Sequence, residues 1–183
     1  MLLTDARNKE ITDRLRSVAS WNGFARQILS EFDRGGLINA NQMAAAERMM
    51  NKLEENSVKV DLSRIREMFE VAVSNGHQKP VYRAEGLKIS LAPATGRNAG
   101  ALYVVMIDDD AYQGKVDGVT FKAVREAAAS TVDALHRIAA NPMEAAVRYG
   151  QKTGKCSCCG RKLTNKVSIE LGIGPICAET WGL

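Results

Sequence analysis

The first 155 residues of this 183-residue chain contain no cysteine, and all four cysteines, Cys156, Cys158, Cys159 and Cys177, lie near its C-terminus. Thiols gathered in this way in an intracellular protein are more typical of a metal site than of disulfides. Histidine is also scarce, with only His77 and His136. Neither a Ser–His–Asp arrangement nor a pair of carboxylates at metal-binding spacing is recognisable. The sequence therefore names no catalytic residues and predicts no enzyme.

Long apolar runs are absent as well. No stretch approaches the roughly 18 apolar residues that a bilayer-spanning helix needs, and the N-terminus has no basic run followed by an apolar segment. Both absences predict a soluble, cytoplasmic protein without a membrane partner. The hydrophobic content of 45% and the charged content of 25% are ordinary globular values. They predict no oligomeric state.

Acidic residues are absent from residues 145–169, although the whole chain has a net charge of only +4. The same segment holds six basic residues, Arg148, Lys152, Lys155, Arg161, Lys162 and Lys166. A local patch of one sign indicates a polyanionic partner more strongly than the total charge does. We therefore predict that these residues bind DNA or RNA and that Tyr149 and Trp181 stack on bases. Alternatively, the basic side chains only solvate the cysteine region and neutralise its thiolates.

The residue pattern predicts an α+β fold with a helical N-terminal part, a small antiparallel sheet in the middle and a zinc-knuckle module at the end. We expect three parts, namely a helical region (1–76), a sheet of three or four strands plus a helix (77–140), and a helix followed by the module (141–183). Alternating segments predict strands within residues 86–92, 101–107, 111–116 and 119–121. Helices are expected from about Lys122 to Ala139 and, after an Asn141-Pro142 cap, to Gly150.

The spacing of the cysteines predicts a metal site. Cys156 and Cys159 form a C-x2-C step, which lets two thiolates converge on one ion, and Gly160 supplies the permissive backbone that such a turn needs. Cys177 follows, but the position where a second C-x2-C step would end is Thr180. We expect Cys156, Cys159 and Cys177 to bind one structural zinc ion. The fourth ligand is left open between Cys158, His136, Glu179 and water.

The stretch Gly172-Ile-Gly-Pro175 has two interpretations. Pro175 would open a helix and place Cys177 near its N-terminus, where the helix dipole stabilises a thiolate. The stretch is then a turn that presents a metal ligand. As a second interpretation, its backbone N–H groups contact a phosphate, as in helix-hairpin-helix motifs.

The run from Cys156-Ser-Cys-Cys-Gly-Arg161 to Gly172-Ile-Gly-Pro-Ile-Cys177 resembles a zinc-ribbon-like module of unknown function that is frequent near the C-termini of phage and prophage proteins. The resemblance covers about 40 residues, and a weaker likeness extends back to about Tyr82. It implies a phage or mobile-element protein in the host cytoplasm and a bound zinc ion, and it does not require a cysteine at position 158.

Together these observations predict a phage-type, zinc-binding accessory protein that binds nucleic acid through its basic C-terminal module. The alternative is a protein-interaction factor, an inhibitor or modulator of a host enzyme or defence complex, with a purely structural zinc ion. Its contact surface would then be the helical face from Met43 to Met50.

Overall fold

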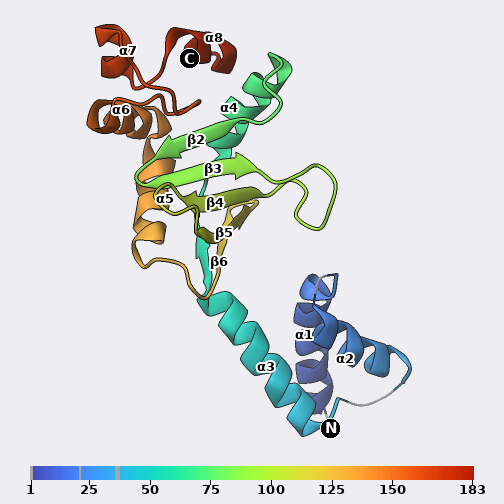
Figure 1. Ribbon diagram of the computed structural model, residues 1–183. Coiled ribbons are helices and arrows are strands. Elements are labelled where there is room, and N and C mark those ends of the chain that lie inside the picture. Colours follow the sequence, from blue (N-terminus) through green and yellow to red (C-terminus); the bar gives the residue numbers. More distant parts are fainter. Residues whose placement is uncertain (1, 21, 36–37) are drawn as a thin grey trace. The chain divides into compact units, whose positions relative to one another are not determined.

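The computed structural model describes residues 2–20, 22–35 and 38–183, which form two compact units, residues 1–56 and 57–183 (Figure 1). The α+β class is confirmed, with helices at the N-terminus and an antiparallel sheet in the middle. The boundary between the units differs from the three predicted parts. The helix α4 (Ser63–Ser74), assigned to the helical region, buries Ile65 and Phe69 in the core of the sheet unit.

The first unit consists of helices α1 (Leu2–Val18), α2 (Gly23–Asp33) and α3 (Ala40–Glu55). The helix α2 begins at an N-cap, where the Asn22 side chain accepts a hydrogen bond from the N–H of Ala25. The hydrophobic core of the first unit includes Leu15, Ile28 and Met50, and Met43 and Met49 pack against it. The methionine face predicted as a contact surface therefore lies largely in the interior of this unit.

The second unit is built on a six-stranded antiparallel sheet in the order β1-β6-β5-β4-β3-β2. The strands are β1 (Ser57–Lys59), β2 (Val81–Ala84), β3 (Leu87–Leu91), β4 (Leu102–Met106), β5 (Tyr112–Asp117) and β6 (Thr120–Ala123). The remaining helices are α5 (Ser130–Ala140), α6 (Pro142–Thr153), α7 (Lys166–Leu171) and α8 (Pro175–Trp181). Within the described residues, no helix is both long enough and apolar enough to cross a bilayer.

One face of the sheet carries the hydrophobic core. Successive side chains of a strand point to opposite faces, and the buried set, including Tyr82, Ile89 and Val104, packs against α4, α5 and α6. Figure 1 shows the C-terminal helices α7 and α8 near the end of the sheet formed by β2. The same core continues into the cysteine segment through Cys156, Leu163 and Trp181.

Two sequence predictions fail here. The sheet has six strands because β1 and β2, which were not predicted, occupy its two edges. The helix predicted from Lys122 begins only at Ser130, because Lys122 pairs with Lys115 of β5. Pairing of β6 with β5 and β1 thus outweighs helix propensity at the start of the predicted helix, where residues 122–123 belong to β6. The cap at Asn141-Pro142 is confirmed, since the Asn141 side chain accepts from the N–H of Glu144.

Candidate metal centre and its basic surroundings

The C-x2-C step forms a tight hairpin. The N–H of Cys156 donates to the carbonyl of Arg161 (2.8 Å), and the N–H of Gly160 donates back to the carbonyl of Cys156 (2.8 Å). Gly160 has a φ of 74°, a left-handed conformation that favours glycine. This turn places Cys156 and Cys159 on one side of the hairpin.

Ser157 attaches this hairpin to the edge of the sheet. Its carbonyl accepts from the N–H of Arg83 in β2 (2.9 Å), and its hydroxyl donates to the carbonyl of the same residue (2.5 Å). Its own N–H donates to the carbonyl of Gly172 (3.0 Å). Ser157 is fully buried. The free edge of β2 is therefore continued by the cysteine hairpin, which is also tied to the turn between α7 and α8.

The third thiol comes from the first turn of α8. Gly174 is the N-cap, Pro175 follows at the first helical position, and Cys177 lies on the first turn. The Sγ atoms of Cys156, Cys159 and Cys177 all lie within 4.8 Å of one another. Tetrahedral zinc with Zn–S bonds of about 2.3 Å requires S–S separations of roughly 3.8 Å. The three thiols are therefore arranged so that they can hold a metal ion.

The surroundings of the Cys156 sulfur are those of a thiolate. The Cys158 thiol donates a hydrogen bond to it, and this bond is the main cause that lowers the pKa of Cys156 to about 4, against the opposing effect of burial. The N–H of Gly174 also donates to this sulfur (3.4 Å). Cys158, which holds the shared proton, has its pKa raised. Burial and the nearby Cys156 charge raise the pKa of Cys177 to about 12.

The candidates for a fourth ligand differ in their distance from the three sulfurs and in whether they line the same cavity. Cys158 is buried and contacts Cys156, but it lies outside the group of sulfurs within 4.8 Å. His136 and Glu179 are exposed, and neither lines the cavity of about 500 Å³ that all four cysteines border. His77 does line this cavity, and its ring lies 6.4 Å from the ring of Trp181. Sequence reasoning missed His77, because it is 79 positions before Cys156 (156 − 77).

The Gly172–Gly174 turn serves the internal structure of the module. The N–H of Gly172 donates to the carbonyl of Ile169 (3.2 Å), and the N–H of Gly174 donates to the Cys156 sulfur. Ile173 is buried in the core. The interpretation as a ligand-presenting turn therefore fits the geometry. The N–H groups of Gly172 and Gly174 already donate hydrogen bonds within the module, so they are not available to bind a phosphate.

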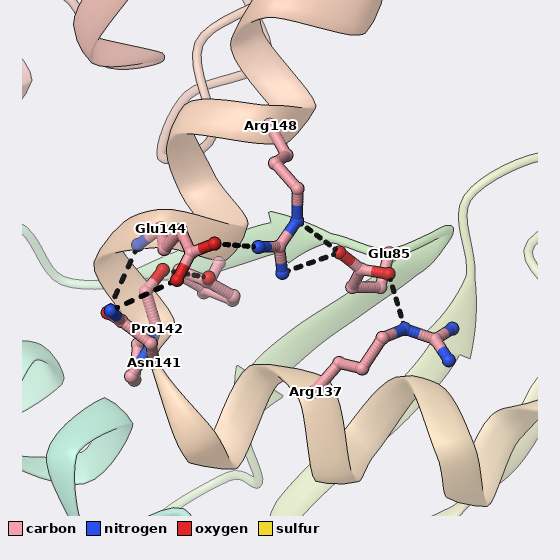
Figure 2. Close-up of polar contacts among 7 residues, drawn as sticks. Glu85, Arg137, Asn141, Pro142, Glu144 and Arg148 are labelled. Atoms are coloured by element: carbon pink, nitrogen blue, oxygen red, sulfur yellow. Dashed lines mark hydrogen bonds and ion pairs between the residues drawn. The ribbon is translucent and has the colours of Figure 1, made fainter.

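The basic residues differ in their surroundings. Among the six, Arg148 is the one that forms salt bridges in the described part of the chain, with Glu85 at 3.1 Å and Glu144 at 2.6 Å. Figure 2 shows that Glu85 also receives the Arg137 side chain. Residues 145–169 contain no acidic residue, but the fold places Glu85 and Glu144 beside Arg148. The other five are exposed around the cysteine module, namely Lys152, Lys155, Arg161, Lys162 and Lys166.

The two aromatic side chains predicted to stack on bases are buried. Tyr149 is 8% exposed and Trp181 is 2% exposed. The Trp181 ring packs edge-to-face against Phe69 of α4, with 5.5 Å between the ring centroids. The stacking prediction is therefore wrong, because both rings belong to the core that joins the module to the sheet unit.

The comparison with known families concerns the segment that carries this centre. Residues 146–182 match a family of unknown function, DUF6011. The match begins on α6 and spans the cysteine hairpin, α7 and α8, so it covers all the elements that gather the three sulfurs. No curated protein and no solved structure shows significant similarity to the chain.

Proposed function

We propose that the C-terminal module is a zinc-stabilised nucleic-acid-binding element of an accessory protein. The observation that carries the proposal is the convergence of three thiols in a module with five exposed basic residues, of which Arg161 and Lys162 line the cavity beside the cysteines. Zinc is the metal of choice for a thiolate-rich, hydrogen-bonded site. The ion would connect the hairpin at Cys156 and Cys159 to α8 at Cys177, two elements that are otherwise held by few hydrogen bonds.

The basic residues would then act through the phosphate backbone. Arg161 and Lys162 project from the hairpin that the metal would rigidify, and both line the cavity beside the cysteines. Lysine and arginine contacts to phosphates supply sequence-independent affinity that falls with salt. Arg148 is not part of this surface, because Glu85 and Glu144 neutralise it. The resemblance of the module to those of phage and prophage proteins supports an accessory role in a phage.

Interaction with a protein is the second candidate. Three apolar side chains of α7 and α8, Val167, Leu171 and Ile176, are more than half exposed beside the basic residues. Val167 and Leu171 lie four positions apart on one face of α7, and exposed apolar groups on one face favour a protein contact. In this case a host enzyme or defence complex would be the partner, and zinc would only hold the surface in shape.

The deciding experiment is a fluorescence-anisotropy titration of the zinc-loaded full chain with labelled DNA and RNA at several salt concentrations. We expect the double variant Arg161→Ala/Lys162→Ala to weaken binding and to reduce the salt dependence by about two ion equivalents. The matched control is Lys9→Ala/Lys52→Ala in the helical unit, which removes the same charge from exposed positions. An unchanged salt dependence in the hairpin variant would remove these residues from the interface.

The role of the metal is tested with Cys159→Ser. We expect this variant to lose its zinc, measured by metal analysis of the purified protein, and to lose nucleic-acid binding at about 150 mM salt. If wild-type protein holds less than half an equivalent of zinc, the metal proposal fails. If it holds zinc but binds no nucleic acid at low salt, the protein-interaction candidate is favoured instead.

A further inference from the structure

The second face of the sheet is not covered by the core. Strand alternation places Tyr103, Val105, Tyr112 and Lys115 on this face, and all are half-buried or exposed, whereas their neighbours Leu102, Val104 and Val116 are fully buried. None of the four outward residues belongs to the hydrophobic core. This open face is a surface that the cysteine module does not explain.

The strand register arranges the open face in two rows. One row runs Lys122, Lys115, Tyr103, Ser90 from β6 to β3. The next row runs Tyr112, Val105, Lys88, Arg83 from β5 to β2. Each row therefore has one tyrosine and two cations. With strands about 4.8 Å apart, the face spans roughly 19 Å from β6 to β2.

The two tyrosines are held in defined positions. Their rings pack edge-to-face, with 5.7 Å between centroids. The hydroxyl of Tyr103 accepts a hydrogen bond from the side chain of Asn98 (3.1 Å), which also binds Lys115. Tyr112 has 42% of its surface exposed. A rigid ring with a free face is suited to stacking, because little side-chain entropy is lost on binding.

The charge of the open face is positive. Its basic side chains are Lys59, Arg83, Lys88, Lys115 and Lys122, and its one acidic side chain is Asp117. Lys88 also pairs with Asp110 of the adjacent turn, and Lys122 pairs with Asp117. The surface thus retains a net charge of about +3, which is complementary to a polyanion.

The open face continues into the cysteine module through Arg83. Its guanidinium donates to the carbonyl of Cys158 (2.5 Å), and its backbone pairs with Ser157. The second row therefore ends at the hairpin that carries Arg161 and Lys162. The outward side chains of β3 and β2 on this face include no acidic residue.

We propose that the open sheet face binds single-stranded nucleic acid, with a base stacked on Tyr112 and a phosphate at Lys115, whose partner Asn98 is uncharged. A duplex hides the faces of its bases, so an exposed ring on a sheet selects unpaired bases. This inference rests on the proposed nucleic-acid-binding function and adds the class of strand and a second binding surface.

The test compares labelled single-stranded and duplex oligonucleotides with Tyr112→Leu, Tyr112→Phe and the control Phe24→Leu. Phe24, an exposed ring of the helical unit, has 39% of its surface exposed. We expect Tyr112→Leu to weaken single-strand binding about tenfold with an unchanged salt dependence, because stacking is lost and no charge is. Tyr112→Phe, Phe24→Leu and all duplex binding should remain as in the wild type. Thermal unfolding confirms that each variant is folded.

A second variant, Lys115→Gln, is expected to reduce the salt dependence by about one ion equivalent. Wild-type affinity in both Tyr112→Leu and Lys115→Gln would overturn the inference. If Arg161→Ala/Lys162→Ala alone weakens binding, the module binds nucleic acid and the sheet face does not. If the wild type binds neither kind of strand, the proposed function fails together with this inference. Tighter binding of a labelled polyglutamate peptide than of the single strand would instead assign the face to an acidic protein.

Discussion

Gly150 of α6 and Gly172, which follows α7, are in direct backbone contact. A Cβ atom on Gly150 would lie 2.1 Å from the Cα of Gly172, and a Cβ on Gly172 would lie 2.2 Å from the carbonyl oxygen of Ala146. Real Cβ atoms do not approach other atoms so closely. The carbonyl of Gly172 also accepts the N–H of Ser157, so this contact fixes the cysteine hairpin as well.

We expect Gly150→Ala to destabilise the sheet unit by about 3 kcal/mol. Alanine favours a helix over glycine by about 1 kcal/mol, but here the clash with backbone atoms outweighs that gain. Gly174→Ala is the matched control in the same module, because its Cβ would meet only the Leu163 side chain at 3.7 Å. Chemical denaturation of both variants measures the difference. Equal free energies of unfolding for Gly150→Ala and Gly174→Ala would show that α6 and the turn at Gly172 can move apart to admit the methyl group at little cost.

Cys158 provides a prediction about the composition of the metal site. We expect Cys158→Ala to retain one zinc per chain, because its sulfur lies outside the group formed by Cys156, Cys159 and Cys177. The variant should still lose about 1–2 kcal/mol of stability, since the side chain is buried and donates to Cys156. Metal analysis and denaturation give the two values. Loss of the ion in Cys158→Ala would make this residue the fourth ligand.

His77 is the histidine that the fold brings to the cysteine cavity. Its backbone N–H donates to the carbonyl of Ala72 (2.8 Å) near the end of α4, and its ring lies next to the ring of Trp181. Trp181 lies one turn after Cys177 on the same face of α8. We expect His77→Ala to weaken zinc binding about tenfold, the usual effect of losing a ligand-supporting group. Chelator competition measures it, with His136→Ala as the control. Equal affinities would remove His77 from the site.

Local signals in the sequence were sufficient for some of these elements. The Asn141-Pro142 cap and the C-x2-C hairpin depend on residues close in sequence, and both were predicted correctly. The hairpin between β2 and β3 was not predicted, although Glu85-Gly86 stands between two alternating segments. Both residues have positive φ, 51° and 78°, as a two-residue hairpin loop requires. The turn was missed because its first loop residue is a glutamate, whereas asparagine or glycine is usual at this position.

Other features depend on contacts between distant segments. The burial of Trp181 follows from Phe69, and the neutralisation of Arg148 follows from Glu85, which is 63 positions away. A pattern of charges along the chain cannot show such pairs. For the same reason the open sheet face emerges only from the strand register, which brings Tyr103 of β4 and Tyr112 of β5 together.

Glu85 accepts hydrogen bonds from Arg137 (2.7 Å) and Arg148 (3.1 Å) while its side chain is 15% exposed (Figure 2). Burial alone would raise the pKa of this carboxyl, but the bonds from the two arginines outweigh it, so the pKa lies below its usual value. A lowered folded-state pKa means that the charged form stabilises the fold. The stabilisation is present above the unfolded-state pKa of about 4.3 and is lost as the pH falls through the folded-state value.

We therefore expect Glu85→Gln to lower the free energy of unfolding by about 1–2 kcal/mol at pH 7 and by almost nothing near pH 2, where glutamate is neutral in both states. Glutamine has the same side-chain length as glutamate, so we expect the backbone of this residue to keep its positive φ in the variant. Glu144→Gln is the matched control, since Glu144 binds the same Arg148 but is 61% exposed, and we expect a loss under about 0.5 kcal/mol. Urea denaturation between pH 2 and 8 measures both. A difference between wild type and Glu85→Gln that does not change with pH would mean that packing, rather than charge, ties β2 to α5 and α6 at this position.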